Sequence, residues 1–206
     1  MNYDYLDHIL GDDAKDEELV GIFERLNIYQ TGAKVDEVLR TMSDRGCIER
    51  RSPNNYRRGE YTFISMLKHF GQEYVDSLEI VNNLNLSIFP ILIRLFEYKD
   101  GSMLVAIKIP GNTGKDIKWG QCLSDVYNLP EAAKQEAVTD LRKLEEAGYL
   151  LQPKFRFSVG VTPNGHVMIP DVPLVRKEDA QDIIDIYSRY NMFGWTHKRP
   201  FTRMFL

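Results

Sequence analysis

The stretch from residue 33 to residue 64 constrains the fold of this chain most strongly. Four apolar side chains in its first part recur at spacings of three and four: Val35, Val38, Leu39 and Met42. This spacing predicts a helix over 33–45 with one buried side. Gly46 then suits the left-handed conformation that commonly ends a helix.

Two short strands and a turn-rich loop are predicted after this helix. The strands cover 47–51 and 61–64, and the loop between them, 52–60, is rich in turn-forming residues. The stretch 45–58 holds five arginines against Glu49 alone, a local charge of +4. The first 24 residues instead carry eight acids against one lysine, or −7. A basic hairpin in an acidic protein indicates a local site for a polyanion.

Composition excludes a general coat of positive charge. The chain has 206 residues, a net charge of −4 and a hydrophobic fraction of 43%, which is ordinary for a folded protein. No apolar run approaches the roughly 20 residues that a membrane span needs, and the acidic N-terminus does not resemble a signal peptide. Cys47 and Cys122 are isolated, which favours reduced thiols and a cytoplasmic location.

Periodicity predicts further elements on both sides of the basic hairpin. Helices are expected at 3–10 and 16–27, and a linker or dimerisation helix at 65–87. Apolar strands at 91–98 and 103–109 flank an Asp-Gly pair, which is a strong hairpin signal.

A second helix–strand unit is predicted in the C-terminal half. Its expected elements are helices at 117–127 and 130–147, a strand at 155–161, a turn at 162–165, a return strand at 166–169 and a last helix at 177–190. When Gly148 is aligned with Gly46, the flanking helices and strands match without gaps, which indicates a weak internal repeat. Any helix–glycine–strand junction would also be apolar at those positions, so a duplication is one of two explanations.

Three helices followed by a two-stranded hairpin resemble the winged helix-turn-helix superfamily. The expected fold class is α+β, with an N-terminal winged helix, a linker helix, a β-hairpin and a second winged-helix-like unit. The expected domains are a winged helix at 1–64, the linker at 65–87, an α+β domain at 88–190 and an aromatic and basic tail at 191–206. The resemblance implies a recognition helix at 33–45 and a wing at 52–60.

The candidate contacts with double-stranded DNA lie on this helix and wing. They are Lys34, Arg40, Arg45, Arg50, Arg51, Asn54, Asn55, Tyr56, Arg57 and Arg58. Arginine forks bind phosphate oxygens, asparagine amides bind a base edge or a phosphate, and Tyr56 would stack or donate a hydrogen bond. Three acids on the helix oppose contact with phosphate, so the wing is the stronger candidate: Asp36, Glu37 and Asp44.

Two functions and one structural explanation remain open at this point. The first function is a dimeric DNA-binding regulator of transcription or replication. The second is an acidic winged-helix module that grips another protein, as an accessory subunit or an inhibitor, without binding DNA. The structural explanation is a solvated hairpin whose arginines protect an edge strand from aggregation. Helix 130–147 carries a net charge of −2 (five acids against three bases), which favours a protein contact or self-association through the C-terminal unit.

No catalytic residue, metal site or cofactor is expected. The run 105–108 matches the lysine strand of protein kinases but lacks their other motifs, and 111–116 has the wrong spacing for a phosphate loop. The four histidines have no ligand spacing. The tail interleaves aromatic and basic residues, which suits either single-stranded nucleic acid or packing on the protein itself.

Overall fold

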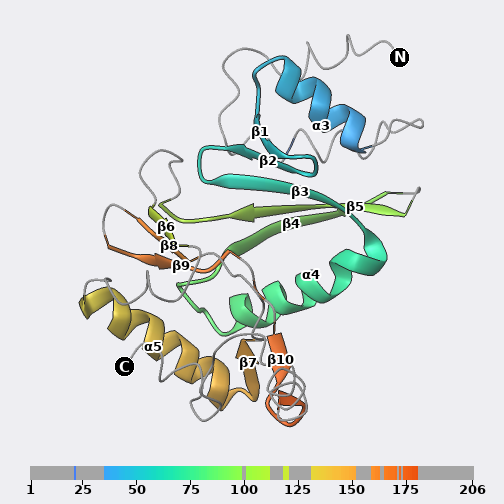
Figure 1. The fold of residues 1–206 in the computed structure, drawn as a ribbon. Helices are drawn as coiled ribbons and strands as arrows, with labels where there is room; N and C mark the ends of the chain where they lie inside the picture. The colour runs from blue at the N-terminus through green and yellow to red at the C-terminus, as the bar shows by residue number, and fades with distance from the viewer. Residues whose placement is uncertain are drawn as a thin grey trace, which may run out of the picture. The chain divides into compact units, whose positions relative to one another are not determined.

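The computed structural model of this protein describes the chain in segments. They are residues 21, 35–98, 101–111, 118–120, 131–151, 159–162, 165–170, 172 and 174–180. The chain divides into two compact units (Figure 1). The N-terminal unit comprises Met1–Val75 and Ile91–Pro110, and the C-terminal unit comprises Asp76–Pro90 and Gly111–Leu206.

The predicted helix at 33–45 is confirmed over its described part. Helix α3 spans Val35–Asp44. Gly46, two residues later, has a left-handed φ of 75° and caps the helix. The amide of Cys47 donates to the carbonyl oxygen of Met42 at 2.9 Å, the backbone pattern of a glycine-ended helix. Val38, Leu39 and Met42 are buried as expected, with exposed fractions of 4%, 0% and 0%.

Within the described residues, five strands form one antiparallel sheet in the N-terminal unit. They are β1 (Glu49–Ser52), β2 (Asn55–Arg58), β3 (Tyr61–Leu67), β4 (Ile91–Glu97) and β5 (Ser102–Lys108). Their order is β1-β2-β3-β5-β4, so β4 and β5 form the predicted hairpin. The sequence had assigned this hairpin to a domain at 88–190, but β5 pairs with β3 along its whole length and belongs to the N-terminal unit.

Strand β5 lies between β3 and β4 in this sheet and is buried on both faces. Every side chain from Met103 to Ile107 is at most 1% exposed. One face packs against α3, through a cluster that includes Leu39, Phe63 and Leu104. In Figure 1, α3 lies next to β1 and β2. A strand that is covered on both faces has an almost continuous run of apolar residues, and residues 103–107 form such a run.

The predicted loop at 52–60 is wrong, because its middle forms strand β2. Tight turns at Pro53–Asn54 and Gly59–Glu60 join β1 to β2 and β2 to β3. Gly59 has a φ of 55°, which a two-residue hairpin with glycine at its first central position requires. Tyr56 of β2 pairs with Phe63 of β3, and both rings are fully buried. The buried ring has no surface for a base, so Tyr56 is not available as a contact residue.

The predicted helix at 65–87 begins later than expected. Residues 65–67 continue β3 because they pair with Leu104, Met103 and Ser102 of β5, and helix α4 then spans Lys68–Asn83. Leu67, the last residue of β3, is 50% exposed. Gly71 of α4 lies close to the side chains of Met103 and Met66, so a Cβ atom there would require these methionines to move.

The C-terminal unit contains one long described helix and two small sheets. Helix α5 spans Glu131–Glu146, strand β7 (Tyr149–Leu151) pairs with β10 (Leu174–Arg176), and β8 (Val159–Val161) pairs with both β6 (Lys118–Gly120) and β9 (Val167–Met168). The helix predicted at 130–147 is confirmed, and the apolar side chains along one side of it are buried: Ala133, Ala137, Leu141 and Leu144. The β8–β9 hairpin also agrees with the prediction. The helix predicted at 117–127 is wrong at 118–120, where β6 lies.

The proposed repeat is matched only in part. Gly148 ends α5 with a φ of 87°, and a strand follows, as at Gly46. However, β1 pairs with the next strand, whereas β7 pairs with β10. Several predicted elements lie outside the described residues: the helices at 3–10 and 16–27 except Gly21, most of the helix at 177–190, and the tail 191–206. The candidate contact residue Lys34 also lies outside them.

Replacing Tyr56 tests whether β2 belongs to the core. Tyr56→Ala should lower the free energy of unfolding by about 3–5 kcal/mol, the range measured for deleting a buried aromatic ring. Tyr56→Phe should cost about 1 kcal/mol or less, because the lost hydroxyl donates only a long 3.4 Å bond to the Pro53 carbonyl oxygen. Urea-induced unfolding measures both, and a loss below 1 kcal/mol for the alanine variant would place Tyr56 in a surface loop.

Candidate functional site

The first candidate site is the basic hairpin, defined here as strands β1 and β2 with Arg45. Residues paired across an antiparallel sheet lie on the same face, and neighbours along a strand lie on opposite faces. Arg50 pairs with Tyr56, and Arg58 pairs with Tyr61, so both arginines lie on the face that packs against α3. Arg57 pairs with Glu49 and lies on the other face.

Glu49 joins two arginines of the hairpin. Its Oε2 atom accepts from Arg51 Nη2 at 3.0 Å and from Arg57 Nη2 at 2.9 Å. Arg57 is mostly buried, with a side chain 14% exposed, whereas Arg51 and Glu49 are 43% and 55% exposed. The β1–β2 register shifts between Arg50 and Ser52, which places Arg51 at a bulge. The only acid of the hairpin is therefore shared by two of its arginines.

The remaining candidate contacts lie on β1, β2, the turn between them and α3. Arg50 is exposed, and its Nε atom donates a long 3.4 Å bond to the Ser52 carbonyl oxygen. Asn54 lies at the exposed turn and accepts from the Ser52 hydroxyl at 3.2 Å. Asn55 is half-buried in β2, and Arg40 and Arg45 are exposed on and just after α3.

The acids of α3 are not equivalent. Asp36 Oδ1 accepts a 2.5 Å hydrogen bond from the Ser65 hydroxyl of β3, so this carboxylate anchors the helix on the sheet. Glu37 is half-buried and Asp44 is exposed. The sequence analysis treated the three acids as one exposed surface. Helical spacing alone does not reveal that Asp36 has a partner, Ser65, 29 residues away.

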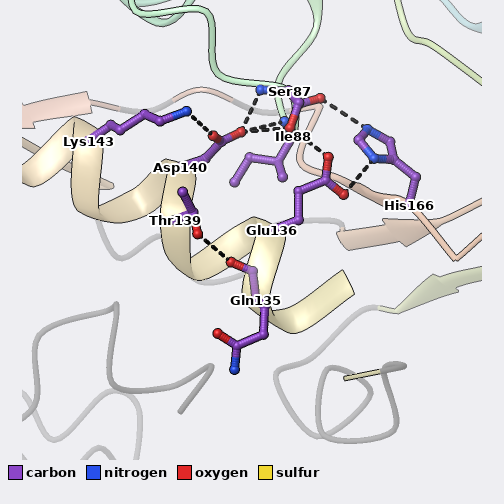
Figure 2. Close-up of polar contacts among 8 residues, drawn as sticks. All are labelled: Ser87, Ile88, Gln135, Glu136, Thr139, Asp140, Lys143 and His166. Atoms are coloured by element: carbon purple, nitrogen blue, oxygen red, sulfur yellow. Dashed lines mark hydrogen bonds and ion pairs between the residues drawn. The ribbon is translucent and has the colours of Figure 1, made fainter. Parts of the chain in front are cut away.

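The second candidate site is a polar cluster in the C-terminal unit, composed of Ser87, Glu136, Asp140 and His166. Figure 2 shows it between α5, the segment after α4 and the residue before β9. Ser87 Oγ lies 2.8 Å from both Glu136 Oε1 and Asp140 Oδ2. His166 contacts Glu136 Oε2 through Nδ1 at 2.9 Å and the Ser87 carbonyl oxygen through Nε2 at 3.1 Å. Since a carbonyl oxygen only accepts, the contact with Ser87 is a hydrogen bond in the tautomer that carries its proton on Nε2.

This polar cluster satisfies the backbone of a buried segment that has no regular secondary structure. Leu86, Ile88 and Phe89 are at most 6% exposed, so the polar backbone groups between them need partners. Asp140 Oδ2 accepts from the amides of Ser87 and Ile88, at 2.5 and 3.2 Å. The Ile169 amide donates to the Ile88 carbonyl oxygen at 2.7 Å, and Asn82 Nδ2 to that of Pro90 at 2.9 Å.

The order of these contacts favours a structural role for the cluster. In hydrolases a histidine contacts the nucleophilic hydroxyl directly, with an acid behind the histidine. Here Glu136 bridges the Ser87 hydroxyl and the His166 ring, and the ring's other nitrogen faces a backbone carbonyl.

Sequence reasoning missed this site, although one signal was present. Asp140 lies within the apolar stripe of α5 and is 4% exposed, and a buried carboxylate needs hydrogen-bond donors.

No model of a known protein family matches the chain, and no similar sequence was found among curated proteins. Within the described segments, no group of histidine, cysteine, aspartate and glutamate is arranged to hold a metal ion. No helix in the described part of the chain is long and apolar enough to cross a membrane.

Replacing Asp140 tests the structural role of the polar cluster. Asp140→Ala should lower the free energy of unfolding by about 3 kcal/mol, because it leaves two backbone donors without their acceptor. The neighbouring Thr139→Ala should change it by less than about 0.5 kcal/mol, since Thr139 is exposed and bonds only within α5. Amide hydrogen exchange at Ser87 and Ile88 should accelerate in the Asp140 variant alone. Unchanged exchange there would contradict this role.

Proposed function

We propose that the N-terminal unit binds double-stranded DNA through the basic hairpin and contacts mainly the phosphate backbone. The observation that carries the proposal is the set of exposed arginines on β1 and on the helix segment that precedes it. Arg50 and Arg51 project from β1, and Arg40 and Arg45 are exposed on and just after α3. Guanidinium groups bind phosphate oxygens through paired hydrogen bonds and keep their charge at any biological pH.

In this proposal the hairpin acts in the manner of a wing, with corrected boundaries. The strands of the wing are β1 and β2, and its tip is Pro53–Asn54, because 55–58 is a strand. Helix α3 takes the position of the recognition helix. Its exposed Asp44 and half-buried Glu37 oppose phosphate, so backbone contact by the hairpin is favoured over base reading by the helix. A regulator of transcription or replication is the class of protein that this arrangement serves.

Arg50 and Arg51 are better targets for mutation than Arg57 and Arg58. Arg57 is mostly buried and lies on the opposite face of the sheet from Arg58, so replacing both would disturb the fold and two surfaces at once. Arg50 and Arg51 are exposed neighbours on the edge strand.

The DNA-binding prediction concerns the salt dependence of affinity. The wild-type protein should bind random-sequence duplex DNA with an affinity that falls with salt, at a log–log slope of about −3 for three to four phosphate contacts. Arg50→Gln with Arg51→Gln should reduce the magnitude of that slope by about 2 and weaken binding to all sequences alike. Fluorescence anisotropy with a labelled duplex, from 20 mM to about 150 mM salt, measures both quantities.

The matched control removes the same charge from another surface. Arg142 on α5 and Arg176 on β10 are exposed in the C-terminal unit, so Arg142→Gln with Arg176→Gln gives an equal change in net charge. This control should bind DNA like the wild type. Equal weakening in both double variants would mean that net charge, and not the hairpin, determines binding. No binding by the wild type at low salt would refute the DNA proposal.

One observation favours a second candidate function, a protein-interaction module that does not bind DNA. Among the residues that the structure describes, strand β1 is at the edge of its sheet, and an edge strand can pair with an extended segment of a partner. Arginines beside that edge would select an acidic segment. Absence of DNA binding at low salt, together with retention of an acidic peptide, is the result that distinguishes this candidate from the first.

A further inference from the structure

We propose that Arg51 and Arg57 form a phosphate subsite that the Glu49 carboxylate occupies until a nucleic-acid phosphate replaces it. This inference rests on the DNA-binding function proposed above and identifies the part of the hairpin that holds a phosphate group. Glu49 Oε2 accepts hydrogen bonds from a terminal nitrogen of each arginine, at 3.0 and 2.9 Å. A phosphate oxygen has the same charge and acceptor character, so the same two donors suit it.

The burial of the three side chains supports an exchange of anions. Arg57 is held by its surroundings, with 14% of its side chain exposed, and this fixes one half of the subsite. Glu49 is 55% exposed and belongs to the edge strand, so its carboxylate can leave without opening the core. Arg51 is 43% exposed at the bulge of β1 and can follow a ligand. An exposed ion pair in water is weak, and a polyanion that contacts several arginines at once can displace it.

In this exchange, Glu49 competes with a phosphate group for Arg51 and Arg57. While its carboxylate lies between the two guanidinium groups, the three side chains together carry a charge of +1. When a phosphate group takes its place, the two arginines are neutralised by the ligand and the carboxylate turns to water. Removal of the Glu49 charge should therefore strengthen DNA binding, whereas removal of an acid elsewhere on the same unit should not.

The test compares Glu49→Gln with Glu60→Gln in the full chain. Glu60 follows Gly59 in the β2–β3 turn, and its Oε2 atom lies 3.3 Å from Lys108 Nζ, so this control also removes one acid from a lysine or arginine partner. Glu49→Gln should bind duplex DNA about fivefold more tightly at moderate salt, near the upper end of the values measured for exposed ion pairs. Its salt slope should stay close to that of the wild type, because a phosphate group occupies the subsite in both complexes. Glu60→Gln should bind like the wild type.

A second measurement tests the subsite without DNA. In Glu49→Gln, inorganic phosphate at constant ionic strength should shift the NMR signals of the Arg51 and Arg57 side-chain Nε–H groups, and chloride should not. Arg57→Lys in the Glu49→Gln background should abolish both this shift and the gain in DNA affinity, because lysine lacks the guanidinium fork. Thermal unfolding confirms that each variant is folded.

The outcomes separate this inference from the DNA-binding proposal. If the wild type binds DNA but Glu49→Gln binds no more tightly, the subsite is refuted and the DNA proposal stands. Equal gains for Glu49→Gln and Glu60→Gln also refute the subsite, because they reflect net charge. If no protein binds DNA but phosphate shifts the two arginine signals, the DNA proposal fails and the subsite stands for a free phosphate group.

Discussion

The two-residue period of the antiparallel sheet is the constraint on which the N-terminal unit depends. Strand β5 is buried on both faces and paired on both sides, so it fixes the register of β3, and β3 fixes that of β2. Once Phe63 faces α3, Tyr56 must do the same and Arg57 must face away. Packing of apolar residues therefore decides which arginines share a surface, since a shift of one residue would move every side chain to the other face.

Local patterns predicted those parts of the fold that depend on local interactions. Helical spacing found α3 and α5 with their buried stripes, Gly46 and Gly148 marked the helix ends, and the Asp-Gly pair marked the β4–β5 hairpin. The strand at 55–58 was missed because Asn, Tyr and two arginines follow a turn signal and read as a loop. Tyr56 is the only buried side chain of β2, and it is buried because β2 pairs with β3. The residues of β2 alone do not reveal that pairing.

The candidate sites show the same limit. Residue types identified the basic hairpin, but the sharing of Glu49 by Arg51 and Arg57 depends on the β1–β2 register and a bulge. In the C-terminal unit, Asp140 meets Ser87 across 53 positions of sequence. Its buried position on α5 was visible in the helical pattern, yet its donors are backbone amides, which no side-chain pattern reveals. Non-local polar contacts of this kind let a segment without regular structure remain buried.

The position of the arginines on an edge strand couples two properties of the protein. Positive charge along β1 makes pairing of that edge with a second copy unfavourable, because like charges would meet across the new strand pair. A bound polyanion would neutralise the same guanidinium groups and so weaken this protection against self-assembly. In the proposed function, solubility and ligand affinity therefore depend on the same group of side chains, and a substitution on β1 should change both.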